Sequence, residues 1–162
     1  MQHKFVLKLF DVAKEMGVHT ALDSNGFLGG RLSDSDLEKI DLVLLDLKSF
    51  DPQLHYRLTG QDVAPVHEFA RRLAAAKRPV WVRLVLVPVV TDNPDDIARN
   101  AAFAASLGNV ERVDVLPFHQ MGAFKWKRLK FDYKLEGVEP PTPEAVERTC
   151  AQFRAAGLNA PY

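Results

Sequence analysis

The sequence predicts an α/β fold, a partial parallel β/α barrel that forms one domain over residues 1–162. Short apolar runs alternate with longer stretches of helical periodicity, which implies parallel strands joined by right-handed crossovers. The strand runs are almost wholly apolar, as expected for strands covered on both faces. Only four such runs are present, too few to close a barrel of about eight strands.

The first half of the chain contains two predicted strands. Residues 2–16 predict an amphipathic helix that stops at Gly17. The apolar runs 18–22 and 42–48 predict strands. Between them, residues 35–38 (Ser-Asp-Leu-Glu) fit a capping box and predict a short helix. The apolar residues at helical spacing in the first helix are Phe5, Leu9, Val12, Ala13 and Met16.

The second half continues the alternation, and its helices begin at capping residues. Asp51-Pro52 and Asn93-Pro94 each supply an N-cap followed by proline at the first helical position. Each of the two strands in this half is closed by a proline, Pro88 or Pro117. The predicted elements are helices 52–59, 63–76, 94–107 and 142–156 and strands 80–87 and 113–116, with an irregular stretch at 118–141.

Composition excludes several classes of protein. Lys and Arg number 21, as do Asp and Glu, so the zero net charge gives no reason to expect a nucleic acid or membrane partner. The only cysteine, Cys150, is interpreted as a core thiol; one cysteine cannot form a disulfide or hold an iron–sulfur cluster or thiolate zinc site. The chain has no membrane-spanning run and no signal-peptide layout, which favours a cytoplasmic protein.

Polar side chains occur at or just after the end of each predicted strand. Ligands of parallel β/α folds bind at this edge, so the convergence predicts a small-molecule pocket. The buried carboxylate of Asp46 needs a cation or partner, and the fork of Arg83 suits a ligand carboxylate. The candidate residues are Asp23, Ser24, Asn25, Asp46, Lys48, Arg83 and His119.

Structural roles are open alternatives for the same residues. Asp23 and Asn25 could form an Asx turn. Asp46 and Arg83 could satisfy each other in a salt bridge, and Lys48 could be solvated. His119 could stabilise a loop by a hydrogen bond. The remaining histidines lack metal-ligand spacing and are interpreted as surface or turn residues: His3, His19, His55 and His67.

Residues 118–141 are too long for a simple connector, and such loops tend to be functional or disordered. The segment contains five aromatic residues, too many for disorder. We therefore expect it to pack across the mouth of the barrel and to contact a ligand or partner. Its basic run, residues 125–130, is typical of solvated surface, with a binding role as the alternative.

Several blocks of the sequence resemble the pyruvate formate-lyase activating enzymes, in the glycyl-radical-activating branch of the radical S-adenosylmethionine superfamily. The similarity runs in register from about Gln2 to the C-terminus. The blocks that carry it are 22–27 (LDSNGF), 41–48 (DLVLLDLK), 81–88 (WVRLVLVP), 116–122 (LPFHQMG), 125–126 (KW) and 133–135 (YKL).

The resemblance implies an open (β/α)6 barrel of which this chain holds the last four β/α units. It also implies that Lys48, Arg83 and His119 contact S-adenosylmethionine. A monovalent cation, Na⁺ or K⁺, would be held beside the methionine carboxylate. Its ligands would be Asp23, Ser24, Asp46 and the backbone carbonyl of Leu44. Lys130 stands where the family often has glycine.

The same resemblance implies a [4Fe–4S] cluster held by a C-x-x-x-C-x-x-C motif, and a Gly-Gly-Glu motif after the next strand. Neither motif is present in these 162 residues, so we expect a chain that begins just after them and is inactive alone. The expected function of the longer protein is to generate the glycyl radical of pyruvate formate-lyase, with an electron donor such as flavodoxin.

Three other functions are kept as alternatives. The chain could belong to an activase of another glycyl radical enzyme. It could be an aldolase-like barrel that uses Lys48 as a Schiff-base nucleophile, although Asp46 would favour the charged ammonium over the neutral amine. It could also be a non-catalytic module that docks a partner through residues 118–141.

Overall fold

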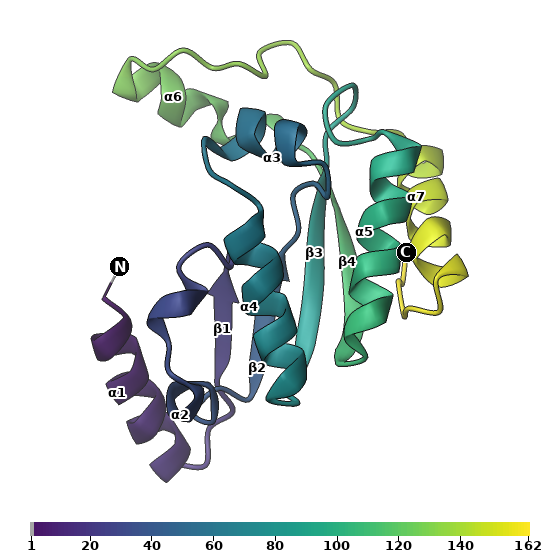
Figure 1. Cartoon of the computed structure of the whole chain (residues 1–162). Coiled ribbons are helices and arrows are strands. Elements are labelled where there is room, and N and C mark those ends of the chain that lie inside the picture. The colour runs from purple at the N-terminus through teal and green to yellow at the C-terminus, as the bar shows by residue number, and fades with distance from the viewer. Residues whose placement is uncertain (1) are drawn as a thin grey trace.

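The computed structural model describes residues 2–162 and contains one four-stranded parallel sheet in the order β1-β2-β3-β4 (Figure 1). The α/β class and the parallel arrangement are therefore as predicted. The strands are β1 (Ala21–Ser24), β2 (Leu42–Asp46), β3 (Val80–Leu86) and β4 (Val110–Pro117). The helices are α1 (His3–Glu15), η1 (Gly29–Arg31), α2 (Asp34–Leu37), α3 (Pro52–Thr59), α4 (Ala64–Ala75), α5 (Pro94–Leu107), η2 (Gln120–Gly122), α6 (Ala123–Leu129) and α7 (Pro143–Ala155).

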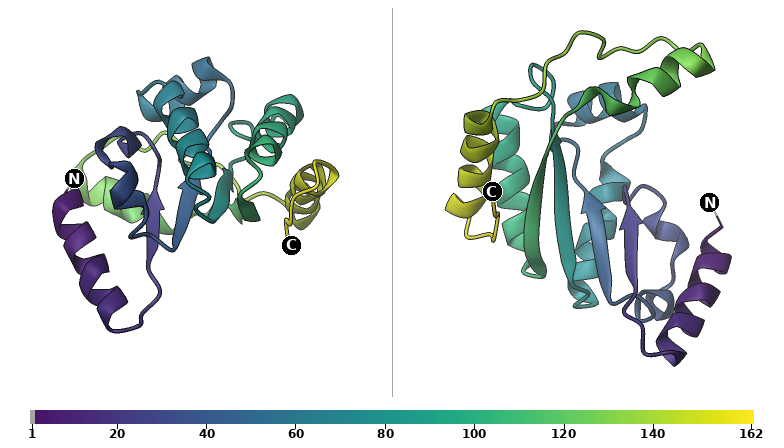
Figure 2. Two further views of the ribbon diagram at one scale, coloured as in Figure 1. Left: turned by 60° about the horizontal axis from the view of Figure 1, so that its bottom comes forward. Right: turned by 180° about the vertical axis from the view of Figure 1, so that it is seen from behind.

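The core lies on one face of the sheet. Burial alternates along the strands, so that in β3 Val80, Val82, Leu84 and Leu86 are buried while the residues between them are half-buried. Helices α4 and α5 cover the buried face, and no helix lies across the other face of the described chain (Figures 1 and 2). The expectation that both faces are covered is therefore wrong. Four strands leave the concave face of a partial barrel open, and only the outer face receives helices.

The predicted helix caps are largely confirmed. The Asp51 carboxylate accepts a hydrogen bond from the Leu54 N–H at 2.8 Å, and the Asn93 side chain accepts from the first turn of α5. The capping box of α2 is shifted by two residues from its predicted place. Ser33 is the N-cap and Asp36 closes the box, because Asp36 reaches back to the Ser33 N–H at 2.9 Å.

Helix α1 is present as predicted, but its apolar periodicity does not define a buried face. Phe5, Leu9, Val12 and Met16 are all exposed, whereas Leu7 is the buried residue of the helix. Leu7 and the half-buried Phe10 pack on the core, and polar contacts also attach the helix to the body. Lys14 pairs with Asp41 at 2.7 Å, and Lys39 pairs with Asp11 at 2.8 Å.

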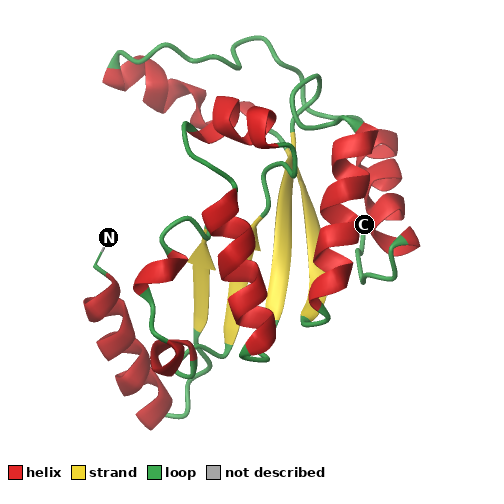
Figure 3. Ribbon diagram, viewed as in Figure 1, coloured by secondary structure: helices red, strands yellow, loops and turns green. Residues whose placement is uncertain are grey.

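The segment 118–141 contains helix α6, although the sequence predicted an irregular stretch. Figures 2 and 3 show α6 standing away from the sheet at the end where the strands finish, and none of its residues is buried. Trp126 lies against Phe131 and Tyr133, with ring centroids 6.2 and 5.7 Å apart. Lys130 ends the helix with φ 58°, a left-handed conformation that favours glycine.

Two histidines that were predicted to be surface or turn residues are buried. His55 is 4% exposed and His67 is 8% exposed. Burial lowers the pKa of both imidazoles, and for His67 the charge of Arg71 lowers it further. The His67 ring packs between Phe50 and Phe103, at 5.0 and 4.4 Å between centroids. A single histidine in an amphipathic helix gives no sequence signal that distinguishes a buried position from a surface one.

Cys150 lies in the core, as predicted, at 1% exposure. Burial raises the pKa of its thiol, which keeps it protonated at neutral pH. None of the helices within residues 2–162 has the length and apolar character needed to cross a membrane.

Gly29 is required by packing against α4. A β-carbon at Gly29 would lie 2.2 Å from two ring atoms of Phe69 and 2.7 Å from its β-carbon, whereas one at Gly30 would meet nothing within 4 Å. We predict that Gly29→Ala lowers the free energy of unfolding by about 1–3 kcal/mol through overpacking. Gly30→Ala should change it by less than about 1 kcal/mol. Urea denaturation measures both, and equal effects of the two variants would contradict the packing role.

Asp41 predicts a specific acid sensitivity. Its contact with Lys14, followed by the Thr20 N–H, lowers the pKa of the Asp41 carboxyl from 3.8 to about 2. Because its pKa is lower in the folded chain, Asp41 stabilises the fold above about pH 4, and this contribution is lost as the pH falls toward 2. Asp41→Asn should therefore flatten the pH dependence of the unfolding free energy in that window. Asp92→Asn, at an exposed carboxylate, should keep the wild-type profile.

Candidate functional site

The strand register brings the predicted site residues together at one edge of the sheet. Asp46 on β2 is the register partner of Arg83 on β3, and Asp23 on β1 is the partner of Leu44. Asp46, Arg83 and Lys48 have half-buried side chains on the open face. Parallel pairing is what places these strand ends side by side, as the sequence predicted.

Arg83 is the centre of the group. Its Nε donates to Asp46 Oδ1 at 3.1 Å, and its Nη2 lies 2.9 Å from the same oxygen. Nη2 also donates to Asp23 Oδ1. The side chains of Arg83 and Asp46 are each 20% exposed, whereas that of Asp23 is 62% exposed. The alternative of a salt bridge between Asp46 and Arg83 is therefore confirmed, and Asp23 is an additional partner.

Lys48 completes the group, since its ammonium donates to Asp46 Oδ2 at 3.0 Å. Both oxygens of Asp46 thus face a cation, and the four charges of Asp23, Asp46, Lys48 and Arg83 sum to zero. Burial alone would lower the pKa of the Arg83 guanidinium. The hydrogen bond that Arg83 donates to Asp23 and the charge of Asp46 outweigh burial and raise that pKa above its ordinary value.

The residues expected to hold a cation are only partly free to do so. Asp23 and Asp46 already bracket one positive group, the Arg83 guanidinium, which stands where a cation between two carboxylates would lie. The Ser24 hydroxyl accepts from the Gly26 N–H at 3.0 Å, and Asn25 makes the Asx-type bond to the Phe27 N–H at 3.2 Å. Within residues 2–162, no group of three or more His, Cys, Asp and Glu side chains could hold a metal ion.

His119 lies apart from the ion-pair group. Its backbone is extended just after β4, its side chain is exposed, and it makes no hydrogen bond within residues 2–162. The loop-stabilising role is thus not observed. The neighbouring Phe118 N–H donates to the Leu86 carbonyl at 3.1 Å, which holds the exit of β4 beside the end of β3. His119 therefore follows the carboxyl end of β4 with an exposed side chain, outside the ion-pair group.

The open face carries a second group that sequence reasoning missed. Arg112 pairs with Asp114 at 2.6 Å, and its guanidinium lies 5.1 Å from the ring centroid of Trp81. Asp114 is the register partner of Arg83, so the two groups share the face. The signal was present in the alternation of Arg112-Val113-Asp114 and Trp81-Val82-Arg83, in which every second residue is polar or aromatic.

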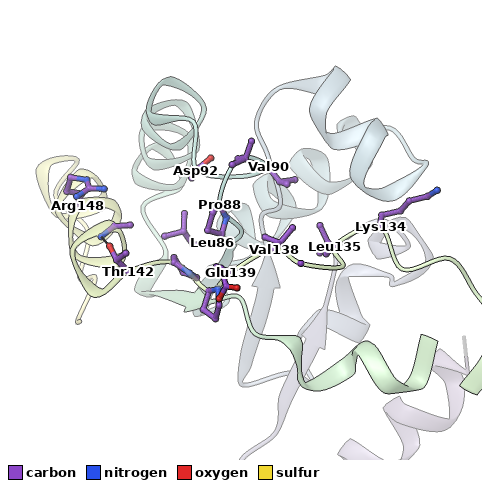
Figure 4. Close-up of a pocket in the computed structure, with 15 residues that line it drawn as sticks. Leu86, Pro88, Val90, Asp92, Lys134, Leu135, Val138, Glu139, Thr142 and Arg148 are labelled. Carbon is purple, nitrogen blue, oxygen red and sulfur yellow. Dashed lines mark hydrogen bonds between the residues drawn. The ribbon is translucent and has the colours of Figure 1, made fainter. Parts of the chain in front are cut away.

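A groove lies beside this edge and not at the ion-pair group. Its volume is about 710 Å³, and Figure 4 shows it between the end of β3, the start of α7 and the segment around Val138. Val89 lines it with φ 66° and 94% exposure, a strained conformation for a β-branched residue. A small cavity of about 80 Å³ lies directly beside Lys48, lined also by Asn25 and His55.

Comparison with known proteins gives close sequence relatives, although no family model matches the chain. The chain is 44% identical over 156 residues to the pyruvate formate-lyase-activating enzyme of Staphylococcus aureus. It is 41% identical over 152 residues to the enzyme of the same name from Listeria monocytogenes. These alignments cover 91% and 90% of this chain. The resemblance to the pyruvate formate-lyase-activating enzymes is confirmed.

The chain spans 61% of the length of these activating enzymes. A domain of a pyruvate formate-lyase-activating enzyme from Bacteroides vulgatus has the same fold, with a TM-score of 0.78, 22% identity, and coverage of 98% of this chain and 89% of that one. Streptococcus suis SuiB bound to S-adenosylmethionine gives a TM-score of 0.69 at 16% identity, over 96% of this chain and 35% of SuiB. The chain thus shares its fold, a partial parallel β/α barrel, with these two proteins.

Asp46 is predicted to be the residue on which the group depends. Asp46→Asn would leave the half-buried Arg83 and Lys48 cations without their shared partner, and we expect a loss of about 1–3 kcal/mol in the free energy of unfolding. Asp23→Asn removes a mostly exposed partner and should lower it by less than about 1 kcal/mol. Urea denaturation at pH 7 provides the comparison, and a larger loss in Asp23→Asn would reverse the assigned order.

Proposed function

We propose that this chain is part of a radical S-adenosylmethionine activase that generates the glycyl radical of pyruvate formate-lyase. The observation that carries the proposal is the half-buried Arg83 guanidinium at the strand edge, bracketed by Asp23 and Asp46, in a chain 41–44% identical to pyruvate formate-lyase-activating enzymes. A planar, permanently charged fork on this edge suits a carboxylate such as that of the methionine moiety.

The proposed roles in ligand binding follow the positions of the side chains. Arg83 would bind the carboxylate, Lys48 would contact the ligand from beside Asp46, and the exposed His119 would reach it from the β4 exit. Asp23 and Asp46, with Ser24 and the Leu44 carbonyl, would supply oxygens to a monovalent cation. Asp23 and Asp46 both contact the Arg83 guanidinium, so the two carboxylates lie close enough to share one positive charge.

The [4Fe–4S] cluster does not fit the residues present. Cys150 is the only cysteine in the sequence, and it is buried in α7 with its thiol protonated. We therefore propose that these 162 residues alone neither assemble the cluster nor cleave S-adenosylmethionine. The partners of the complete activase would be pyruvate formate-lyase and a reductant such as flavodoxin, in the cytoplasm.

The alternatives receive different support. The Schiff-base hypothesis requires a neutral Lys48 amine. The 3.0 Å contact between Lys48 and Asp46 favours the charged ammonium and so weakens this hypothesis. The hypothesis of a partner-docking module is supported by α6, which has no buried residue. Its Phe124 and Leu129 each have an exposed fraction above 60%. Exposed apolar side chains on such a helix are compatible with partner binding by the activase itself.

The proposal is tested by calorimetric titration of the 162-residue chain with S-adenosylmethionine. We expect measurable binding by the wild type, and a loss of about 10- to 100-fold in affinity in Arg83→Lys, because the ammonium cannot reproduce the guanidinium fork. Arg112→Lys makes the same change on the same face, away from the site, and should bind like the wild type. Equal losses in both variants, or no binding by the wild type, would contradict the proposed site.

A further inference from the structure

The hydrogen bonds of Arg83 divide its guanidinium into two unequal parts. Asp46 takes one side: its Oδ1 accepts a hydrogen bond from Nε at 3.1 Å and lies 2.9 Å from Nη2 as an ion-pair contact. The other side is the fork formed by Nη1 and Nη2. Asp23 accepts from Nη2, and Nη1 makes no hydrogen bond with residues 2–162. One donor of the second fork is thus occupied and the other is free.

A carboxylate binds arginine most strongly through two parallel hydrogen bonds to one fork. The side facing Asp46 is closed, because that carboxylate is only 20% exposed and is also held by Lys48 at 3.0 Å. An incoming carboxylate must therefore use Nη1 and Nη2. It cannot take the Nη2 proton without displacing Asp23.

Asp23 is the partner that can be given up. Its side chain is 62% exposed, so water can solvate the carboxylate when the guanidinium leaves. Asp46 is half-buried and pairs with two cations, so its displacement would leave a poorly solvated charge. The net charge of the group also favours this order. The four side chains are neutral together, and a ligand carboxylate adds a negative charge that leaves Asp23 in need of a positive partner.

We propose that Asp23 is a positioning residue, which holds the Arg83 guanidinium in place in the free chain and is displaced when a carboxylate ligand binds. The freed Asp23 then takes a monovalent cation. This inference rests on the proposed function, since S-adenosylmethionine is the carboxylate ligand considered. If Asp23 were only a cation ligand, neutralising it without a small cation present would not raise the affinity for S-adenosylmethionine. If Asp23 is displaced by the ligand, neutralising it should raise that affinity.

The test is titration of the 162-residue chain with S-adenosylmethionine in tetramethylammonium chloride and in potassium chloride, at equal ionic strength. In tetramethylammonium, whose ion is too bulky to sit between two carboxylates, Asp23→Asn should bind about three- to fivefold more tightly than the wild type, because no partner has to be displaced. In potassium, the wild type should gain affinity and Asp23→Asn should not. Decarboxylated S-adenosylmethionine should show no gain in Asp23→Asn.

Asp114→Asn is the matched control. It removes the same charge from the same row of the open face, but Asp114 pairs with Arg112 and not with Arg83, so its affinity should equal that of the wild type in both salts. Weaker or unchanged binding by Asp23→Asn in tetramethylammonium overturns the displacement and leaves the proposed function standing. If neither chain binds S-adenosylmethionine in either salt, the proposed function fails, and this inference fails with it.

Discussion

The ion-pair group around Arg83 allows charged side chains to lie half-buried on the open face of this sheet. A guanidinium at 20% exposure requires partners, and Asp46 supplies them from the adjacent strand in register. Lys48 then balances the second oxygen of Asp46. A neutral, mutually satisfied group costs little to keep half-buried. Its most exposed member, Asp23, is the partner that we propose a ligand displaces. In the proposed exchange, stability and ligand binding would use different halves of the same arginine.

The one-sided packing of the sheet explains why this group remains accessible. Helices α4, α5 and α7 bury apolar residues of the strands on the outer face, while the alternate positions of β3 and β4 carry Trp81, Arg83, Arg112 and Asp114. A strand residue cannot serve both faces, so polar residues on the inner face do not disturb the core. The exposed apolar side chains of α1 and α6 lie outside this core and contribute nothing to it.

Much of the candidate site could be predicted because it lies on regular parallel strands. Asp46 and Arg83 follow from buried strand runs, and parallel pairing alone brings them to one edge. The sequence could not predict which group Arg83 contacts, because Arg83 could have faced a ligand, Asp46 or both. The depth of His55 and His67, and the helix within 118–141, also depended on how α3 to α5 and the last loop pack.

The sequence by itself determined the alternation of strands and helices, the polar residues at the strand ends and the kinship with pyruvate formate-lyase-activating enzymes, because periodicity and local motifs are properties of neighbouring residues. Only the tertiary structure decided which sheet face is open and that Asp23 shares Arg83 with Asp46. The shared contact joins Arg83 to Asp46 and Asp23, which lie 37 and 60 residues away along the chain, and strand register fixes its geometry. Local sequence carries no information about which of several charges will meet at that distance.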